Sequence, residues 1–514
     1  MAVLDPELVA RAMVPGPVAP GDWLAILPPG LMLVAGAVAV MLRGRPRPQM
    51  MVAVGSLALL VIVDALLLAR VGTDGPFTMM MGGWLPPFGI AFTVDVAGAA
   101  LALTAAVVGL AAASYVGFAQ DAVAVRHGFF PFLLMLMAGV SGSFLTGDIF
   151  NLYVWFEVLL ISSFGLLVVG GTAIQLDGAV KYGILNLIAT TLFLIAVGLL
   201  YGTLGTLNMA DIALKLSAAE VEGPIATIAA LFLMAFAMKA AAFPLNAWLP
   251  AAYHTPRVVV SAVFGGLLTK VGIYALIRVL AMLMPAERAW LADVIAVIAG
   301  ATMLIGAFGA LAEGNMRRLV GYLVISGVGV LLAGLAIGSE AALSGMVAYA
   351  IHSMLATAAL YLAVGLAEEA AGSPRLADAG GLWRATPVLA AVSLMLLFAL
   401  SGLPPFSGFW PKAMLVEAAL AGSAGWMATL ILVTGFLNTM AAGRVFLFAF
   451  WRPAPEGAVR TAPDSGVLVP VVALVFVVTL LGIQPEPLIE VARAGGLGLA
   501  NPAAYITAVF GGTP

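Results

Sequence analysis

The sequence predicts an all-α polytopic membrane protein with about fourteen transmembrane helices. Three observations support this prediction. The chain of 514 residues is 63% hydrophobic and only 9% charged, whereas a soluble domain carries about 25% charged residues. Its apolar runs repeatedly reach about 20 residues, the length that spans a bilayer. Two of the runs are interrupted by prolines beside a lysine, a pattern typical of helices that line a transport pathway.

The apolar runs give the elements in order. We expect spans near residues 23–42, 50–70, 92–117, 128–147, 149–170, 179–201, 224–249, 257–282, 290–312, 318–337, 341–367, 386–418, 425–449 and 466–484. Backbone inside a membrane must satisfy its own hydrogen bonds, and these runs are too long and unbroken for barrel strands, so they are predicted to be helices. No stretch between spans is long enough for a separate soluble domain.

Two of the expected helices are interrupted. Pro244 and Pro250 lie in AAFPLNAWLP of the seventh span, and Pro404 and Pro405 lie in LSGLPPFSGFWPK of the twelfth. Proline removes a backbone donor and breaks the helical ladder, which a membrane tolerates only where protein or water covers the break. The two breaks are five helices apart, which is consistent with a repeat of five helices.

The basic residues of the loops predict an orientation. Apart from three lysines inside spans, one set of alternate loops contains thirteen basic residues: Arg43, Arg45, Arg47, Arg126, Lys181, Arg257, Arg317, Arg318, Arg375, Arg384, Arg444, Arg452 and Arg460. The other set, which includes both termini, contains six: Arg11, Arg70, Lys215, Arg278, Arg288 and Arg493. Cytoplasmic loops are the richer in Lys and Arg, so we expect both termini on the outer side.

Composition argues against several classes of function. The chain has no cysteine and only three widely separated histidines, so neither a disulfide, a thiol nucleophile nor a metal cluster is expected. The charges are too few and scattered for a nucleic-acid surface. There is no nucleotide loop or nucleophile triad, so a soluble catalytic function has little support and no cofactor is expected. The N-terminus, MAVLDPELVARAMVPGP, is unlike a cleaved signal peptide.

Four charged residues inside the apolar runs are the main functional signal. Lys239, Lys270 and Lys412 are three of only five lysines, and Glu157 lies in FNLYVWFEVLLISSFGLLVV. A lysine at mid-bilayer costs about 2.5–3.5 kcal/mol. Glu157 and Lys239 lie near the middle of their spans and are expected to sit together or share water. The set predicts a charge-handling relay from Lys239 through Lys270 to Lys412; the alternative is a group of structural ion pairs that lock helices together.

Other polar residues have two interpretations each. His254 could carry protons between Lys239 and Lys270, or it could be a loop histidine at the interface. His352 could belong to the relay or be a satisfied core histidine. Glu417 could tune Lys412 or lie at the helix end. Asp64 and Asp95 are interpreted as interface or packing residues.

Several segments resemble a known family. The chain is similar to the antiporter-like subunits that Mrp-type multisubunit cation/proton antiporters share with respiratory complex I, and most similar to the D-type subunits. The motifs are FNLYVWFEVLLISSFGLLVVGG, GTLNMADIA, MKAAAFPLNAWLP, GNMRRLVGYLVISGVGV and LSGLPPFSGFWPKAMLV, within roughly 130 to 420. By motif match, the functional residues of the family fall on Glu157, Lys239, Lys270 and Lys412.

The resemblance also implies an organisation. Fourteen helices would contain two inverted five-helix repeats, with helices 7 and 12 broken. The corresponding division is 1–127 for helices 1–3, 128–282 for the first repeat, 283–450 for the second, and 451–514 for helix 14 and the tail. We do not expect the long lateral-helix extension of the largest relatives.

The implied activity is that of a secondary transporter subunit rather than an enzyme. Protons would move along a buried Glu/Lys/His/water relay in exchange for Na⁺ or another monovalent cation. The partners would be A-, B-, C-, E-, F- and G-type subunits and lipid, in a bacterial plasma membrane. One alternative is a proton-pumping subunit of a complex I or membrane-hydrogenase type redox complex; another is a passive scaffold.

The chain departs from the family pattern in three places. A lysine usually follows the histidine of the eleventh span, but HSMLATAALYL has none and Thr357 stands near that position. Asn246 or Ala247 stands where a histidine is frequent, and Ala251 stands where an acid commonly follows WLP. The link from Lys270 to Lys412 is therefore expected to rely on His352, hydroxyl groups and water.

Overall fold

The computed structural model describes residues 12–14, 18–218 and 223–511. Within these residues, ten helices are long and apolar enough to cross a membrane: α3 (Pro46–Asp74), α4 (Val96–Ala119), α7 (Ile149–Leu167), α8 (Ala173–Leu204), the continuous helix Val258–Leu283, α15 (Ala292–Ala312), α16 (Met316–Ile337), α17 (Glu340–Ala371), Gly425–Trp451 and α22 (Ser465–Ile483). Four shorter apolar helices are α2 (Leu27–Met41), α6 (Phe129–Leu145), α10 (Ile225–Ala240) and α19 (Pro387–Ser401). Each predicted span contains one of these helices, so the all-α membrane class is confirmed, whereas the exact number of crossings stays a prediction.

Two of the long helices contain π-helical segments. The helix Val258–Leu283 consists of α12 (Val258–Val263), the π-segment η3 (Phe264–Leu268), α13 (Thr269–Leu276) and the π-segment η4 (Ile277–Leu283). The helix Gly425–Trp451 consists of α21 (Gly425–Val445) and the π-segment η5 (Phe446–Trp451). Such segments are frequent at functional sites, and η3 immediately precedes the segment with Lys270.

Smaller elements connect the spans or, in the case of α11 and α20, form the second halves of interrupted helices. They are η1 (Pro20–Ala25), β1 (Phe77–Met80), η2 (Met81–Gly83), β2 (Ala91–Val94), α5 (Ala122–Arg126), α9 (Met209–Ala218), α11 (Trp248–Tyr253), α14 (Pro285–Trp290), α18 (Leu382–Ala385), α20 (Phe409–Ala421), α23 (Glu486–Ala500) and α24 (Ala503–Phe510). Strands β1 and β2 are antiparallel, with Phe77 opposite Val94. The hairpin, α9, α23 and α24 are additions to the predicted elements, because each is too short or too polar to be read as a span.

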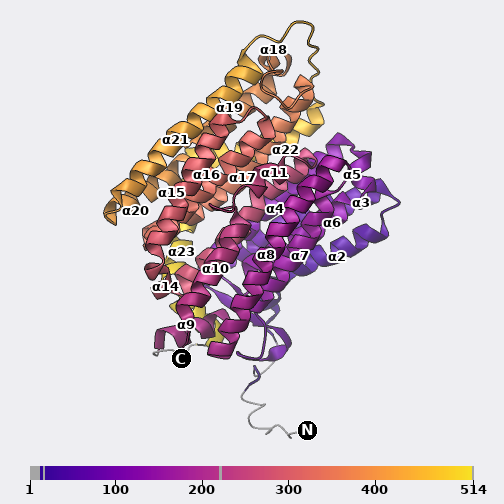
Figure 1. Ribbon diagram of the computed structural model, residues 1–514. Coiled ribbons are helices and arrows are strands. Elements are labelled where there is room, and N and C mark those ends of the chain that lie inside the picture. Colours follow the sequence, from indigo (N-terminus) through magenta and orange to yellow (C-terminus); the bar gives the residue numbers. More distant parts are fainter. Residues whose placement is uncertain (1–11, 15–17, 219–222, 512–514) are drawn as a thin grey trace.

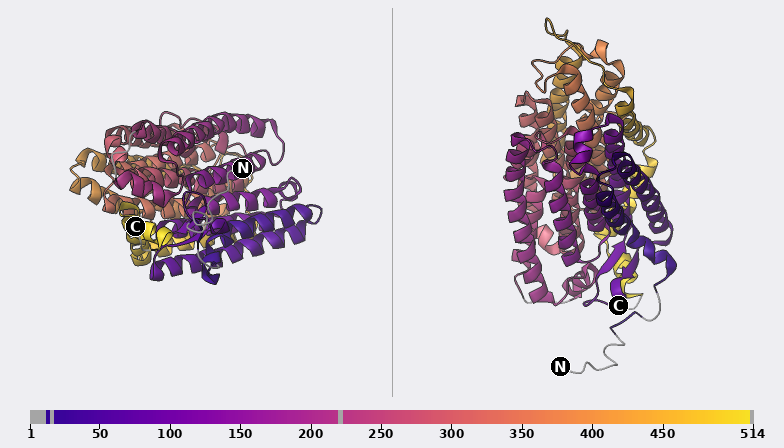
Figure 2. Two further views of the ribbon diagram at one scale, coloured as in Figure 1. Left: turned by 90° about the horizontal axis from the view of Figure 1, so that it is seen from below. Right: turned by 90° about the vertical axis from the view of Figure 1, so that its right-hand side faces the viewer.

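Several of the smaller elements lie at two opposite ends of an elongated molecule (Figure 1). Figure 1 shows α9 and α14 at the lower end and α5 and α18 at the upper end. Strand β1 packs against both η1 and α24, which places the described parts of the N- and C-terminal regions at one end. Seen from that end in Figure 2, the N-terminal helices form one long edge and α8 lies along the opposite edge.

Several arginines of the predicted basic loops join those loops to one another at the upper end. The Arg317 guanidinium donates a hydrogen bond to the Pro256 carbonyl. The Arg460 guanidinium donates hydrogen bonds to the carbonyls of Ala371 and Gly380. We predicted that Arg278 lies in a loop at the other end, and this prediction is wrong. Arg278 lies in η4, and its side chain is 1% exposed. Its position at the end of an apolar run made it look interfacial.

Helix α17 is the centre of the bundle. Every residue of its apolar window is buried, and it packs against α4, α12, α16, α19, α20, α22 and α23. Small residues allow this close packing: a Cβ on Gly365 would lie 2.2 Å from the Val258 side chain. His352 and Thr357 both lie on α17, so the fold encloses them among other helices.

The two broken helices have similar geometry. Helix α10 ends at Ala240 and α11 begins at Trp248, while α19 ends at Ser401 and α20 begins at Phe409. A residue with left-handed backbone follows each first half, Ala241 with φ 60° and Gly402 with φ 83°. The gaps contain Pro244 in one case and Pro404 and Pro405 in the other, as predicted. Pro250 was wrongly assigned to the break, because it lies within the first turn of α11, where proline is tolerated.

The contact between α15 and α16 yields a stability prediction. A Cβ on Gly306 would lie 2.3 Å from the backbone nitrogen of Ser326. Gly306→Ala should therefore force the helices apart and lower the stability by about 1–3 kcal/mol, the usual effect of overpacking. The measurement is the melting midpoint of the purified protein in detergent. Gly198→Ala, which places its Cβ in open space on α8, is the control and should melt like the parent; equal midpoints for both variants would contradict the packing argument.

Candidate functional site

The three predicted lysines are all buried, each beside an irregular part of a helix. Lys239 is the second-last residue of α10, Lys270 follows η3 in α13, and Lys412 lies in the first turns of α20. Their exposed fractions are 5%, 2% and 9%. A charged ammonium in such surroundings needs hydrogen-bond acceptors or an opposite charge.

Lys270 finds its acceptor on its own helix. Its Nζ donates to the Gly265 carbonyl at 2.8 Å. Gly265 belongs to η3, where the π-helical turn changes the regular i to i+4 pairing. The side chain of Lys270 therefore points back along the helix toward α12 and is held at the π-segment.

Lys412 binds the end of the other half of its broken helix. Its Nζ donates to the Leu400 carbonyl at 3.1 Å and to the Ser401 carbonyl at 2.8 Å. These are among the last carbonyls of α19, which have no intrahelical partner and form the negative end of the helix dipole. The interruption between α19 and α20 thus creates the acceptor site for this ammonium.

Lys239 and Glu157 do not sit in direct contact, which was one of the two arrangements that the sequence suggested. Among the described residues, no ion pair joins them within 4.0 Å. Lys239 Nζ instead lies 4.9 Å from the centre of the Phe156 ring, on the residue before Glu157. Glu157 is half-buried on α7, and its Oε1 is buried without a hydrogen-bond partner. The carboxylate still acts electrostatically on Lys239, so the two groups are near but separate.

His352 lies between the second and third lysines. Its exposed fraction is 0%, and both Lys270 and Lys412 act on it electrostatically. Nδ1 shares a hydrogen bond of 2.8 Å with Ser407 Oγ, in the gap between α19 and α20. Nε2 is buried without a partner, so one ring nitrogen remains available to a water or a proton carrier.

Thr357 lies on the Lys270 side of α17. A Cβ on Gly265 would lie 3.2 Å from the Thr357 Cγ2, and Gly265 is the residue whose carbonyl Lys270 binds. Thr357 is 2% exposed. Thr357 stands near the position where the family usually has a lysine. It therefore lies next to Gly265, whose carbonyl accepts the hydrogen bond from Lys270.

The two remaining candidates are His254 and Glu417. His254 ends α11, where Nδ1 contacts the Pro250 carbonyl at 2.8 Å, and its charged neighbours are Arg317, Arg318 and Glu313. Glu417 is exposed and lines the same cavity as Lys412, of about 840 Å³, between α20 and α21. Both residues stay predictions as carriers or tuning groups.

The sequence interpretation missed the significance of three buried charges. Asp64 on α3 is fully buried, and neither carboxylate oxygen has a partner. Asp95, the N-cap of α4, pairs with Arg278 at 2.5 Å. The available signal was the position of Arg278 in VGIYALIRVL inside a predicted span, but the pairing spans 183 residues and leaves no local pattern. Among the described residues, no group of three His, Cys, Asp or Glu could hold a metal ion.

The comparison with protein families agrees with this architecture. A family profile described as "NADH:quinone oxidoreductase/Mrp antiporter, TM" matches residues 146–438. The chain belongs to this antiporter family. The matched region extends from just before α7 to α21 and includes Glu157, the three buried lysines and both helix breaks.

Members of the family with high similarity are D-type antiporter subunits. The chain is 34% identical over 488 residues to the D subunit of the Na(+)/H(+) antiporter of Alkalihalophilus pseudofirmus, which covers 95% of this chain and 99% of the relative. It is 37% identical over 453 residues to the D subunit of the Na(+)/H(+) antiporter of Bacillus subtilis, covering 88% and 92%. The similarity therefore extends over nearly the whole length of both relatives.

Solved structures show the same fold. A chain in the Mrp complex from Dietzia sp. superposes with a TM-score of 0.90 at 28% identity, covering 96% of this chain and all of that one. A chain of respiratory complex I from Thermus thermophilus superposes with a TM-score of 0.81 at 24% identity, covering 93% and 100%. The second likeness concerns the fold alone.

The hydrogen bond between His352 and Ser407 gives a prediction for the link between Lys270 and Lys412. Ser407→Ala removes this bond, whose net value is about 0.5–1.5 kcal/mol, so the predicted proton transfer through His352 should slow by roughly two- to tenfold. The measurement is the initial rate of cation-dependent proton movement in everted vesicles at equal amounts of assembled complex. Ser162→Ala, whose buried hydroxyl bonds only the Val158 carbonyl of its own helix, is the control. An unchanged rate in Ser407→Ala would show that the orientation of His352 does not limit transport.

Proposed function

We propose that the chain is the D-type subunit of a multisubunit monovalent cation/proton antiporter, and that it moves protons. The observation that carries this proposal is the set of buried lysines, which lie at helix interruptions and form no direct ion pair with a carboxylate of the described residues. Near full-length similarity to the D subunits of two Na(+)/H(+) antiporters supports it. A transporter subunit rather than an enzyme follows from the same relatives.

The proposed path runs from Glu157 through Lys239, Lys270 and His352 to Lys412. A nearby carboxylate stabilises the protonated ammonium, and movement of that carboxylate away favours release of the proton. Because Glu157 and Lys239 are near but not in contact, a small rearrangement changes their interaction. Moving one charge through 100 mV is worth about 2.3 kcal/mol, the same order as such a rearrangement, so the relay can be coupled to the membrane potential.

The exported ion is proposed to be Na⁺ or another monovalent cation, in an assembly with A-, B-, C-, E-, F- and G-type subunits. The Mrp complex from Dietzia sp., which contains a chain of the same fold, supports the assembly. The alternative of a redox-driven proton pump has weaker support, since the complex I likeness is at 24% identity. The division into repeats 128–282 and 283–450 remains part of the proposal; the similar geometry of the two helix breaks supports it.

The proposed location is the bacterial plasma membrane, with both termini on the outer side. Arg257, Arg317, Arg375, Arg452 and Arg460 lie at one end of the molecule, opposite β1, β2 and α24. The positive-inside rule makes the arginine-rich end cytoplasmic.

Loss of the relay charges gives a direct test of the transport role. Lys239→Ala and Glu157→Ala should each abolish antiport in everted vesicles while the complex still assembles, because each removes an obligatory charge from the path. Lys181→Ala and Asp177→Ala remove an exposed ion pair at 2.5 Å on α8 and serve as matched controls with parental activity. Full antiport in both relay variants would refute the proposed role, and a passive scaffold predicts that result.

The orientation can be tested with single cysteines, because the chain has none of its own. Asn501→Cys, in an exposed position at the end with α24, should react with a membrane-impermeant thiol reagent added to intact cells. Glu456→Cys, exposed in the loop before α22 at the arginine-rich end, should react only in everted vesicles. The opposite pattern would reverse the proposed topology.

A further inference from the structure

The most deeply buried ion pair of the described chain lies outside the proposed relay. Arg278 and Asp95 have side chains that are 1% and 7% exposed, whereas every other ion pair among the described residues has at least one side chain exposed by 24% or more. Replacement of a buried pair by apolar residues is often neutral or stabilising. Its presence therefore calls for an explanation other than stability alone.

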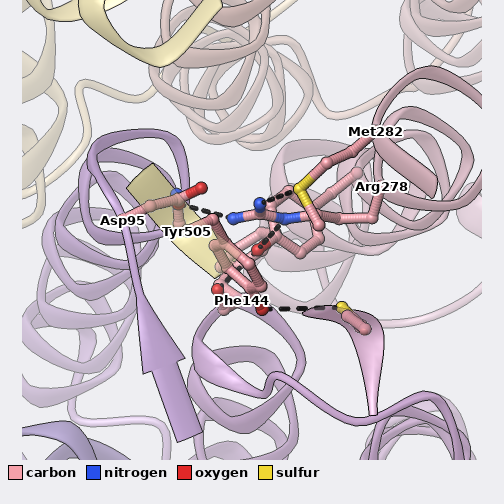
Figure 3. Close-up of polar contacts among 8 residues, drawn as sticks. Asp95, Phe144, Arg278, Met282 and Tyr505 are labelled. Carbon is pink, nitrogen blue, oxygen red and sulfur yellow. Dashed lines mark hydrogen bonds and ion pairs between the residues drawn. The ribbon is translucent and has the colours of Figure 1, made fainter. Parts of the chain in front are cut away.

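Arg278 is held on all sides (Figure 3). Nη2 donates to Asp95 Oδ1 at 2.5 Å, Nε donates to the Tyr274 hydroxyl at 2.8 Å, and Nη1 contacts Met282 Sδ at 3.1 Å. The Tyr505 ring of α24 covers the guanidinium at 5.4 Å. Five hydrogen-bond donors on a planar group permit this fixed geometry, which a lysine could not adopt.

The pair lies beside a cavity, with Asp95 in the cavity wall. The cavity, of about 630 Å³, opens at the end of the molecule with α24 and is lined by Asp95, Glu490 and Asn501 among others. Asp95 lies at its wall and Arg278 lies behind Asp95. Arg278 is two helical turns beyond Lys270 on the same continuous helix, a distance of about 12 Å along its axis.

Tyr274 fills the interval between the two cationic residues. It lies one turn from each on α13, and its hydroxyl donates to the Phe144 carbonyl at 2.6 Å. A Cβ on Gly98 would lie 3.2 Å from this hydroxyl, so α4, α6 and α13 meet here without free space. A cation that moved from the cavity toward Lys270 would have to pass the guanidinium and then this contact.

We propose that Arg278, held in place by Asp95, is the barrier that stops protons and monovalent cations in the outer cavity from reaching Lys270. A fixed arginine in a narrow path excludes protons and cations by its charge. The proposal rests on the assignment of Lys270 to the proton relay. It makes Arg278 a specificity-determining residue that prevents a short circuit, so that protons in the relay continue to Lys412.

The barrier is tested by passive proton leak in proteoliposomes that contain the whole complex. A K⁺ gradient with valinomycin supplies the potential, Na⁺ is absent, and a trapped dye reports pH. Arg278→Gln should raise the leak at least ~5-fold, since it removes the repelling charge. Asp95→Asn should stay as tight as the parent, because the amide oxygen still accepts from Arg278 Nη2 and the positive charge stays in place. Asp22→Asn combined with Arg70→Gln, a more exposed pair at the same end, is the control and should not leak.

A barrier role and a purely structural role of the Arg278–Asp95 pair predict different proton leaks in the two variants. A purely structural pair predicts equal behaviour of Arg278→Gln and Asp95→Asn, and either that result or an unchanged leak in Arg278→Gln would overturn the proposal. Antiport itself is not the readout, so a failure of the relay assignment is detected separately, by full antiport in Lys270→Ala.

A second measurement keeps the test valid if Arg278→Gln does not assemble. Ser141→Cys places a thiol on α6, one turn deeper than Phe144. In the otherwise unchanged chain, Ag⁺ added on the outer side of the native complex should protect Asn501→Cys from alkylation but leave Ser141→Cys unprotected. Because Ser141 is fully buried, the alkylation is done after removal of free Ag⁺ and denaturation. Equal protection of both thiols would show that a monovalent cation passes the pair, and the proposal would be wrong.

Discussion

The hydrogen-bond requirement of interrupted helices determines where the charges lie. A carbonyl released inside a membrane needs a donor, and two of the buried lysines supply it: Lys270 at the π-segment η3 and Lys412 at the end of α19. These two ammonium groups are in turn held by backbone carbonyls, with no ion pair to a carboxylate in the described part of the chain. The free carbonyls of the interrupted helix and the buried ammonium thus stabilise each other. Removal of either one leaves the other without its hydrogen-bond partner. The first break is satisfied differently, since the Trp248 indole donates to the Met238 carbonyl while the Lys239 ammonium faces the Phe156 ring.

Prediction from the sequence succeeded where the signal is local. Long apolar runs give the spans, because hydrophobic length alone decides which segments are able to cross, and the burial of Lys239, Lys270 and Lys412 follows from their positions in those runs. The partners of these residues are not local. The separation of Lys239 from Glu157, the bond between His352 and Ser407, and the pairing of Asp95 with Arg278 all depend on how distant helices pack. Family resemblance pointed to the four relay charges but gave no information on the outer pair.

The polar groups of the proposed relay are not equally enclosed. Glu157 is half-buried on α7, His352 is fully enclosed on the central helix α17, and Lys412 lines a cavity between α20 and α21. The middle of the proposed path is therefore its most enclosed part, while Glu157 and the cavity beside Lys412 lie nearer the surface of the chain.

The cavity beside Lys412 has a consequence for electrical insulation. Its walls include Leu420, Leu432 and Phe436, which are exposed apolar side chains. Water in this groove would hydrate the ammonium, whereas hydrocarbon or an apolar side chain would raise the free energy of its charged form. The material that fills the groove thus sets the charge of the last lysine. The proposed proton path is therefore sealed at this point by whatever lies against the outer face of the cavity. This chain supplies only the inner face.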